Sequence, residues 1–121
     1  MKILCLDTST KNFSLAVSKD ERVIRYRNIY LDKVLESSII PAVERILHDS
    51  HLKLKDIDGF AIGLGPGSFT SLRVGLSTIK AFAWATGKPI VGISSLDVLA
   101  QNAEDQKVDE VCTIMIGKNA R

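Results

Sequence analysis

Residues 63–75 are the part of this sequence best suited to chemistry. They read Gly-Leu-Gly-Pro-Gly-Ser-Phe-Thr-Ser-Leu-Arg-Val-Gly and join an apolar run to a helix-forming run. A loop of this composition can direct several backbone N–H groups at an anion, and the N-terminus of the next helix adds about half a positive charge. The pattern therefore predicts an anion or nucleotide loop, which comprises Gly65, Pro66, Gly67, Ser68, Phe69 and Thr70.

The glycine-rich run does not match the general nucleotide-binding motifs. A Walker A loop needs Gly-Lys followed by Ser or Thr, which is absent, and Ser68 stands where G-x-G-x-x-G requires its third glycine. The alternative is a structural turn in which Gly65 and Gly67 adopt unusual backbone angles and Pro66 stiffens the loop, with Ser68 or Thr70 capping the helix. The residues alone leave both interpretations open.

Two histidines, His48 and His51, lie three residues apart near a predicted helix end, a spacing that could suit two metal ligands. No HExxH arrangement and no cysteine pair accompanies them, and polar or cationic side chains are common at helix C-termini. No Ser/His/Asp arrangement can be assembled from neighbouring spacing either. We therefore expect no catalytic residues, no metal site and no cofactor.

A local group of basic residues, Arg22, Arg25 and Arg27, falls on one predicted strand. Charge on an edge strand prevents unwanted strand pairing, so a solvated edge is the first interpretation and contact with RNA is the alternative. The net charge of +2 and the isoelectric point near 8.6 are too mild to argue for nucleic acid by themselves.

The elements that must position these residues follow from the apolar spacing. Residues 3–6, 13–17 and 23–29 predict three antiparallel strands joined by two hairpins. Asp32 can cap the helix that follows, and Pro41 should kink that helix or mark a restart.

The second half of the chain predicts alternating strands and helices. Residues 57–63 predict a buried strand, residues 71–86 a helix and residues 90–93 a strand. Ser94-Ser95-Leu96-Asp97 forms a capping box that opens a third helix, and residues 111–116 predict a last strand. The order βββαβαβα indicates an α/β domain with a mixed sheet flanked by helices.

The predicted helix at 71–86 has two apolar faces. Leu72, Leu76, Ile79 and Ala83 form the face suited to the sheet. A second strip of small residues lies beside a tryptophan and basic groups, which suits either a protein partner or burial under the first helix of the same domain. The predicted partner interface comprises Arg73, Val74, Ser77, Ala81, Trp84 and Ala85.

The composition is that of an ordinary globular protein, with 121 residues, 45% of them hydrophobic and 25% charged. One domain is the expectation for this length. Cys5 and Cys112 each lie in an apolar run, where a free thiol behaves as a small hydrophobe, and this indicates a reducing compartment. No run approaches the ~20 apolar residues of a membrane span, and the opening is too short for a signal peptide, so we expect a cytoplasmic protein.

Three segments of the chain resemble the TsaB (YeaZ) family. Residues 65–76 resemble its GPGSFTGLRIG signature, residues 3–10 resemble its opening LAIDTST, and residues 90–100 resemble its PLVGVSSLEALA segment. Ser71 replaces a glycine of the signature, and Leu35-Glu36 replaces the His-Ser of many relatives. The related TsaD family uses histidines in that region to hold a metal, and this sequence offers none there.

The resemblance implies an actin-like (ribonuclease H-like, ASKHA) domain at residues 1–105. It further implies that residues 106–121 form a linker and the first strand of a truncated second domain. In such folds, kinases place a carboxylate and a phosphate loop where this chain has Asp7, Thr8, Ser9 and Thr10. Because this turn lacks glycine, its backbone has less freedom to wrap around a phosphate. Its hydroxyls could still contact a phosphate, or they could bond within a tight turn.

The implied function is a non-catalytic scaffold in the formation of threonylcarbamoyladenosine on tRNA. The resemblance implies a TsaD-like transferase as partner, a TsaE-like ATPase in the complex, a homodimer when the chain is alone, and only indirect contact with tRNA. Two enzymes are the alternatives: a small actin-like ATP-binding phosphotransferase domain, and a glycoprotease-type peptidase.

Overall fold

The computed structural model describes residues 1–9, 12–20, 22–30, 35–67 and 69–94. Its strands are β1 (Lys2–Asp7), β2 (Asn12–Lys19), β3 (Arg22–Tyr30), β4 (Gly59–Gly63) and β5 (Ile90–Ile93). Its helices are α1 (Leu35–Asp49), the short 3-10 helix η1 (Leu54–Asp56) and α2 (Phe69–Thr86).

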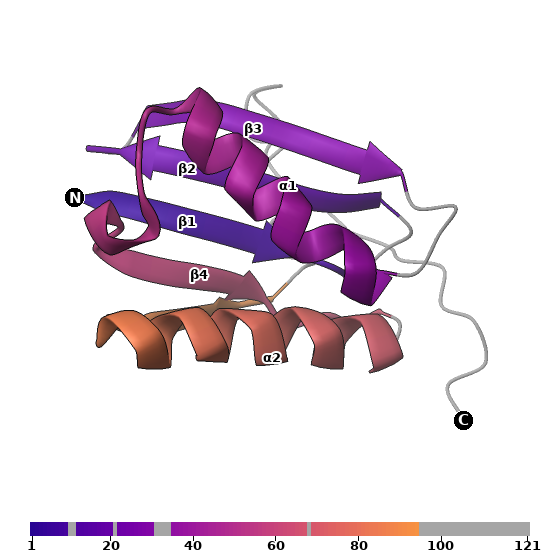
Figure 1. Cartoon of the computed structure of the whole chain (residues 1–121). Helices are drawn as coiled ribbons and strands as arrows, with labels where there is room; N and C mark the ends of the chain where they lie inside the picture. Colours follow the sequence, from indigo (N-terminus) through magenta and orange to yellow (C-terminus); the bar gives the residue numbers. More distant parts are fainter. Residues whose placement is uncertain (10–11, 21, 31–34, 68, 95–121) are drawn as a thin grey trace, which may run out of the picture.

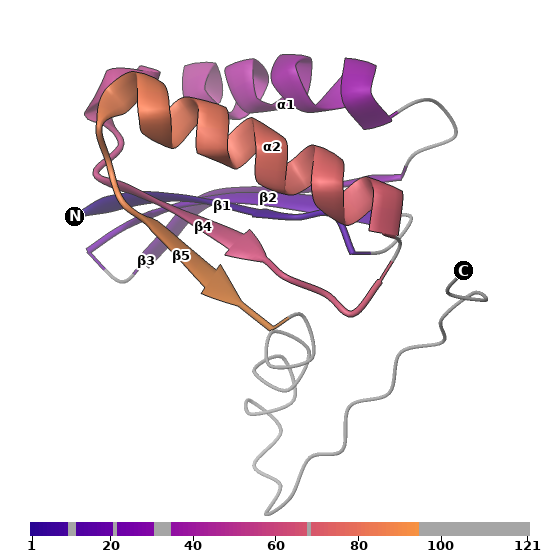
Figure 2. The same ribbon diagram turned by 90° about the horizontal axis from the view of Figure 1, so that it is seen from below.

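The strands form one mixed sheet in the order β3-β2-β1-β4-β5 (Figure 1). The two hairpins make β1–β2 and β2–β3 antiparallel, whereas β1–β4 and β4–β5 are parallel because helices connect them. Both α1 and α2 lie on the same face of the sheet (Figure 2). This confirms the predicted actin-like α/β class, and the observed order matches the prediction up to β5.

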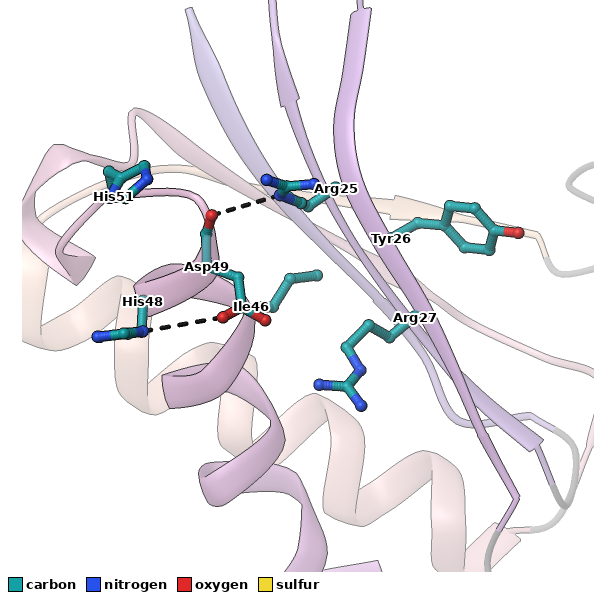
Figure 3. Close-up of a pocket in the computed structure, with 7 residues that line it drawn as sticks. All are labelled: Arg25, Tyr26, Arg27, Ile46, His48, Asp49 and His51. Carbon is teal, nitrogen blue, oxygen red and sulfur yellow. Dashed lines mark hydrogen bonds and ion pairs between the residues drawn. The ribbon is translucent and has the colours of Figure 1, made fainter.

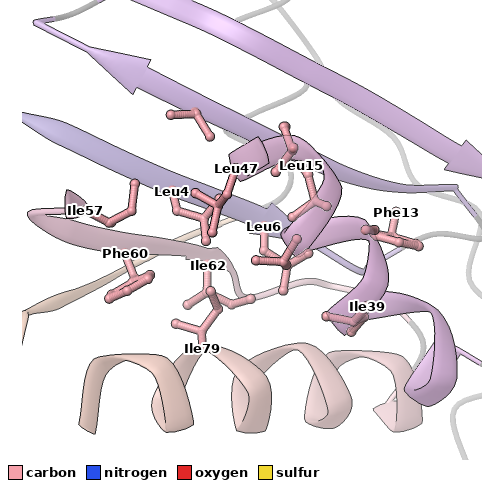
Figure 4. Close-up of a cluster of buried hydrophobic side chains, with 14 of the residues drawn as sticks. Leu4, Leu6, Phe13, Leu15, Ile39, Leu47, Ile57, Phe60, Ile62 and Ile79 are labelled. Carbon is pink, nitrogen blue, oxygen red and sulfur yellow. The ribbon is translucent and has the colours of Figure 1, made fainter. Parts of the chain in front are cut away.

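The core lies between this face of the sheet and the two helices (Figure 4). Alternate residues of β1 and β2 point into it, as period-two strands require. The interior strand β4, between β1 and β5, is buried at every position. The helices add residues at spacings of three and four, namely Ile39, Val43 and Ile46 from α1 and Ile79 and Ala83 from α2.

The structure corrects three element boundaries. Pro41 lies inside the single helix α1 and does not restart it. The strand predicted from residue 57 begins at Gly59, because Ile57 N–H closes the turn of η1 by donating to the Leu54 carbonyl at 3.1 Å. Helix α2 begins at Phe69, two residues before the prediction, so Thr70 is part of the helix and not its cap.

Several predictions fall outside the described residues: the Asp32 cap, the Ser68 cap, the capping box beyond Ser94, the strand at 111–116 and the domain boundary at residue 105. Within the described part of the chain, no helix has the length and apolar character needed to cross a membrane.

Candidate functional site

The turn after β1 packs against the glycine-rich segment after β4. Strands β1 and β4 are adjacent and parallel, so their C-terminal ends lie at the same edge of the sheet. Thr8 is fully buried and Ser9 is 7% exposed, although both are polar. The structure thus brings together two motifs that lie more than fifty residues apart in the sequence, while Thr10 and Ser68 lie outside the described residues.

Three glycines of the segment make room for three consecutive residues of the β1 turn. A Cβ added to Gly63 would overlap the Asp7 carboxylate, one added to Gly75 would overlap Thr8 Oγ1, and one added to Gly67 would overlap the Ser9 backbone. A side chain at Gly63 or Gly75 would therefore displace the Asp7 or Thr8 side chain, and one at Gly67 would displace the Ser9 backbone. The spacing of the glycines was visible in the sequence, but their partners were not.

Hydrogen bonds within this site occupy the groups that could otherwise contact a phosphate. Thr8 Oγ1 donates to the Ser71 carbonyl oxygen at 2.7 Å, which ties the turn to the first part of α2. Ser9 N–H donates to Asp7 Oδ1 at 2.8 Å, the pattern of an Asx turn. The arrangement of residues 7–9 matches the tight-turn interpretation more closely than an open phosphate loop.

The backbone of the glycine-rich loop corrects one expectation. Gly65 has a φ of +93°, which favours glycine, as predicted. Gly67 does not lie in that region, so the prediction that it adopts unusual angles is wrong. Gly67 is required instead because the Ser9 backbone approaches it closely.

The outer side of the loop and the start of α2 are exposed. Pro66, Gly67 and Thr70 lie at the surface, and the Phe69 side chain is 72% exposed. The Arg73 guanidinium lies 5.4 Å from the centroid of the Phe69 ring, within the range of a cation–π contact.

The predicted partner strip on α2 is largely exposed, with one exception. Val74 is half-buried and packs against the core, unlike the other members of the strip. The other members, Arg73, Ser77, Ala81, Trp84 and Ala85, are all exposed, and Trp84 is 89% exposed. Burial of this strip under α1, the alternative left open by the sequence, is not observed.

The remaining candidates lie away from this site. His48 is in the last turn of α1 and His51 follows the helix, and the described residues contain no group of three or more His, Cys, Asp or Glu able to hold a metal. Burial raises the pKa of the Cys5 thiol, which favours its neutral, less nucleophilic form. Cys112 lies outside the described residues.

Comparison with known proteins shows similarity along most of the chain. A family model described as TsaD, tRNA N6-adenosine threonylcarbamoyltransferase, matches residues 32–121. The tRNA threonylcarbamoyladenosine biosynthesis protein TsaB of Bacillus subtilis is 35% identical over 102 residues, which cover 84% of this chain and 44% of that protein. TsaB of Escherichia coli is 36% identical over 103 residues, which cover 85% of this chain and 44% of that protein.

A solved structure shares the fold. It is an uncharacterized protein from Pseudomonas aeruginosa with similarity to peptidase YEAZ, and it superposes with a TM-score of 0.81 at 29% identity, covering 88% of this chain and 49% of that one. The chain therefore spans about half the length of the relatives that it matches.

Proposed function

Because this chain belongs to the TsaD family, and within that family to its TsaB (YeaZ) branch, we propose that it is a non-catalytic protein partner in the formation of threonylcarbamoyladenosine on tRNA. A TsaD-type protein carries the transfer reaction, and a TsaE-type ATPase joins the complex. The complex works in the cytoplasm, and the chain alone forms a homodimer.

The exposed strip of α2 is the observation that carries this proposal. Ala81 and Ala85 lie one helical turn apart, beside the 89% exposed indole of Trp84. The opposite side of the same helix is already packed in the core through Ile79 and Ala83. Small residues allow a second helix to approach closely, and tryptophan is a frequent anchor of protein interfaces. The strip therefore suits a helix of a partner protein.

The geometry of the β1 turn supports a scaffold over an ATP-binding enzyme. The Thr8 hydroxyl and the Ser9 amide, which a phosphate loop would offer to its ligand, already bond within the domain. We assign the glycine-rich loop to holding α2 against the sheet, since its glycines accommodate the β1 turn.

Co-sedimentation of the chain with a TsaD-type protein tests the proposal. Ala85→Glu and Ala81→Glu should abolish the complex while leaving the melting temperature unchanged, because a charge desolvated in a packed interface is costly whereas an exposed one is not.

Val23→Glu is the matched control, because it places the same charge at an exposed apolar residue, 64% exposed, on β3. This variant should still bind. Retained binding by the α2 variants would show that α2 is not the interface, and loss of binding by all three variants would show that the effect does not depend on position.

A further inference from the structure

A groove of about 510 Å³ lies at the far edge of the sheet, between β3 and the C-terminal end of α1. Arg25 and Arg27 extend from the same side of β3 toward α1, while Tyr26 between them points the opposite way (Figure 3). This alternation follows from the strand's period of two. It places two arginines along one wall of the groove, with Cα atoms about 7 Å apart along the strand.

The charges that line the groove leave a positive excess. Arg25 Nε donates to the backbone carbonyl oxygen of Asp49 at 3.3 Å, which holds its guanidinium at the negative end of the α1 dipole. Asp49 is the one carboxylate among the described lining residues, and it is already engaged: Arg45 Nε lies 3.5 Å from Oδ2, and His48 Nδ1 lies 3.8 Å from Oδ1. In the part of the chain that the structure describes, Arg27 has no ion-pair partner.

The backbone at the end of α1 adds an independent observation. Leu52 N–H donates to the Leu47 carbonyl oxygen at 2.9 Å and His51 N–H donates to the His48 carbonyl oxygen at 3.0 Å, the two bonds of a Schellman motif. Its left-handed position is usually glycine, yet here it is His51, with a φ of +58°. The chain thus keeps an imidazole at the groove in a conformation that is costly for residues other than glycine.

We propose that this groove binds the phosphate backbone of RNA. Guanidinium groups match phosphate oxygens in paired hydrogen bonds, and two of them spaced along an extended strand suit successive phosphates of one chain better than a single small anion. This inference rests on the proposed function for the identity of the RNA, a tRNA held by the partner protein. It revises the sequence-based expectations of a solvated edge and of indirect tRNA contact.

Fluorescence anisotropy with a labelled anticodon stem-loop RNA tests the proposal, with the 121-residue chain titrated at several NaCl concentrations. Arg27→Ala should weaken binding by roughly fivefold or more and reduce the slope of log K against log[NaCl] by about one, because one phosphate contact is lost. Lys80→Ala removes the same charge from an exposed position on α2 and should bind like the unchanged chain. Equal effects of the two variants, or no binding at low salt, would overturn the proposal.

His51→Gly separates binding from folding. Glycine relieves the left-handed position, so this variant should melt at a higher temperature and yet bind RNA more weakly. A stabilised variant with unchanged affinity for RNA would show that the His51 side chain does not contribute to RNA binding in the groove. Inorganic tripolyphosphate serves as competitor: displacement of the RNA at equal phosphate concentration would identify a small-anion site and overturn the RNA assignment.

Co-sedimentation of the Arg27→Ala chain with the TsaD-type protein keeps the two proposals apart. We expect the variant to retain the partner, because Arg27 lies on β3, away from the α2 strip. If the unchanged chain binds RNA but not the TsaD-type protein, the proposed function is contradicted and the RNA-binding proposal stands. If it binds the TsaD-type protein but not RNA, only the RNA-binding proposal is contradicted.

Discussion

Among the individual residues, the glycines of the segment after β4 are needed mainly because the β1 turn approaches them closely, and less because of their backbone angles. Gly63, Gly67 and Gly75 each face one residue of the β1 turn, and no side chain fits at these positions without displacing a neighbour. The same contacts explain why Thr8 is fully buried. The polar turn is stable there because its hydroxyl bonds to the Ser71 carbonyl oxygen.

Gly67→Ala should destabilise the chain by about 1–3 kcal/mol, because the added methyl group overlaps the Ser9 backbone and forces it to shift. Gly59→Ala is the matched control, since its added Cβ would lie 3.7 Å from the Pro89 carbonyl oxygen, an ordinary contact. Thermal melts of the two variants measure the difference. Equal melting temperatures would contradict the close-packing explanation.

The chain should bind ATP or ADP weakly if at all, because the Ser9 amide and the Thr8 hydroxyl are engaged within the domain. Calorimetry at millimolar nucleotide measures this. A dissociation constant in the low micromolar range would instead favour the alternative of an actin-like ATP-binding domain.

At the scale of elements, α1 and α2 pack on the sheet in different ways. Helix α1 contains a proline at an exposed position and continues through it. Helix α2 places Gly75 against the β1 turn and Ile79 and Ala83 in the core, and it leaves its other side exposed. The packed face holds α2 on the sheet, and the exposed face makes no contact with the core, so it can be changed without loss of core packing.

Pro41→Ala should stabilise the chain by about 1–3 kcal/mol, because alanine restores the backbone N–H that proline lacks and removes the clash of the ring with the preceding turn. Chemical denaturation followed by circular dichroism measures the change. A lower free energy of unfolding would show that α1 needs the proline, for instance to set its direction.

At the scale of the whole molecule, both helices lie on one face of the five-stranded sheet, and each end of the fold offers a different surface (Figures 1 and 2). The exposed strip of α2 centres on two alanines and the Trp84 indole, whereas the groove at β3 is lined by two arginines. Two surfaces of different chemistry on opposite sides of one domain suit a protein that joins a protein partner to an RNA.

The chain alone should self-associate through the α2 strip, and Trp84→Ala should shift it toward monomer without lowering its melting temperature, because the indole is 89% exposed in the single chain. Sedimentation velocity over a range of concentrations measures this. An oligomer unaffected by Trp84→Ala would place the contact elsewhere.

Local patterns in the amino-acid sequence were sufficient to predict the class of fold and most of the elements. A short apolar run identified β1, alternation at period two identified β2, and helical spacing identified the core side of α2, because these patterns reflect burial and need no knowledge of distant contacts. Signature motifs with long, specific matches also identified the family. The observed starts of α2 at residue 69 and of β4 at residue 59 each differ by two residues from the predicted starts, since local hydrogen bonds decide where an element begins.

The neighbours of the glycines and arginines, in contrast, became visible only in the folded chain. The turn at residues 7–9 meets the glycine-rich segment because the adjacent parallel strands β1 and β4 end at the same edge of the sheet, and no local pattern encodes that contact. Likewise, Val74 packs half-buried against the core, and Arg25 and Arg27 line a groove with the end of α1. Such assignments depend on which distant segment packs against a residue, and packing of this kind is a property of the folded chain as a whole.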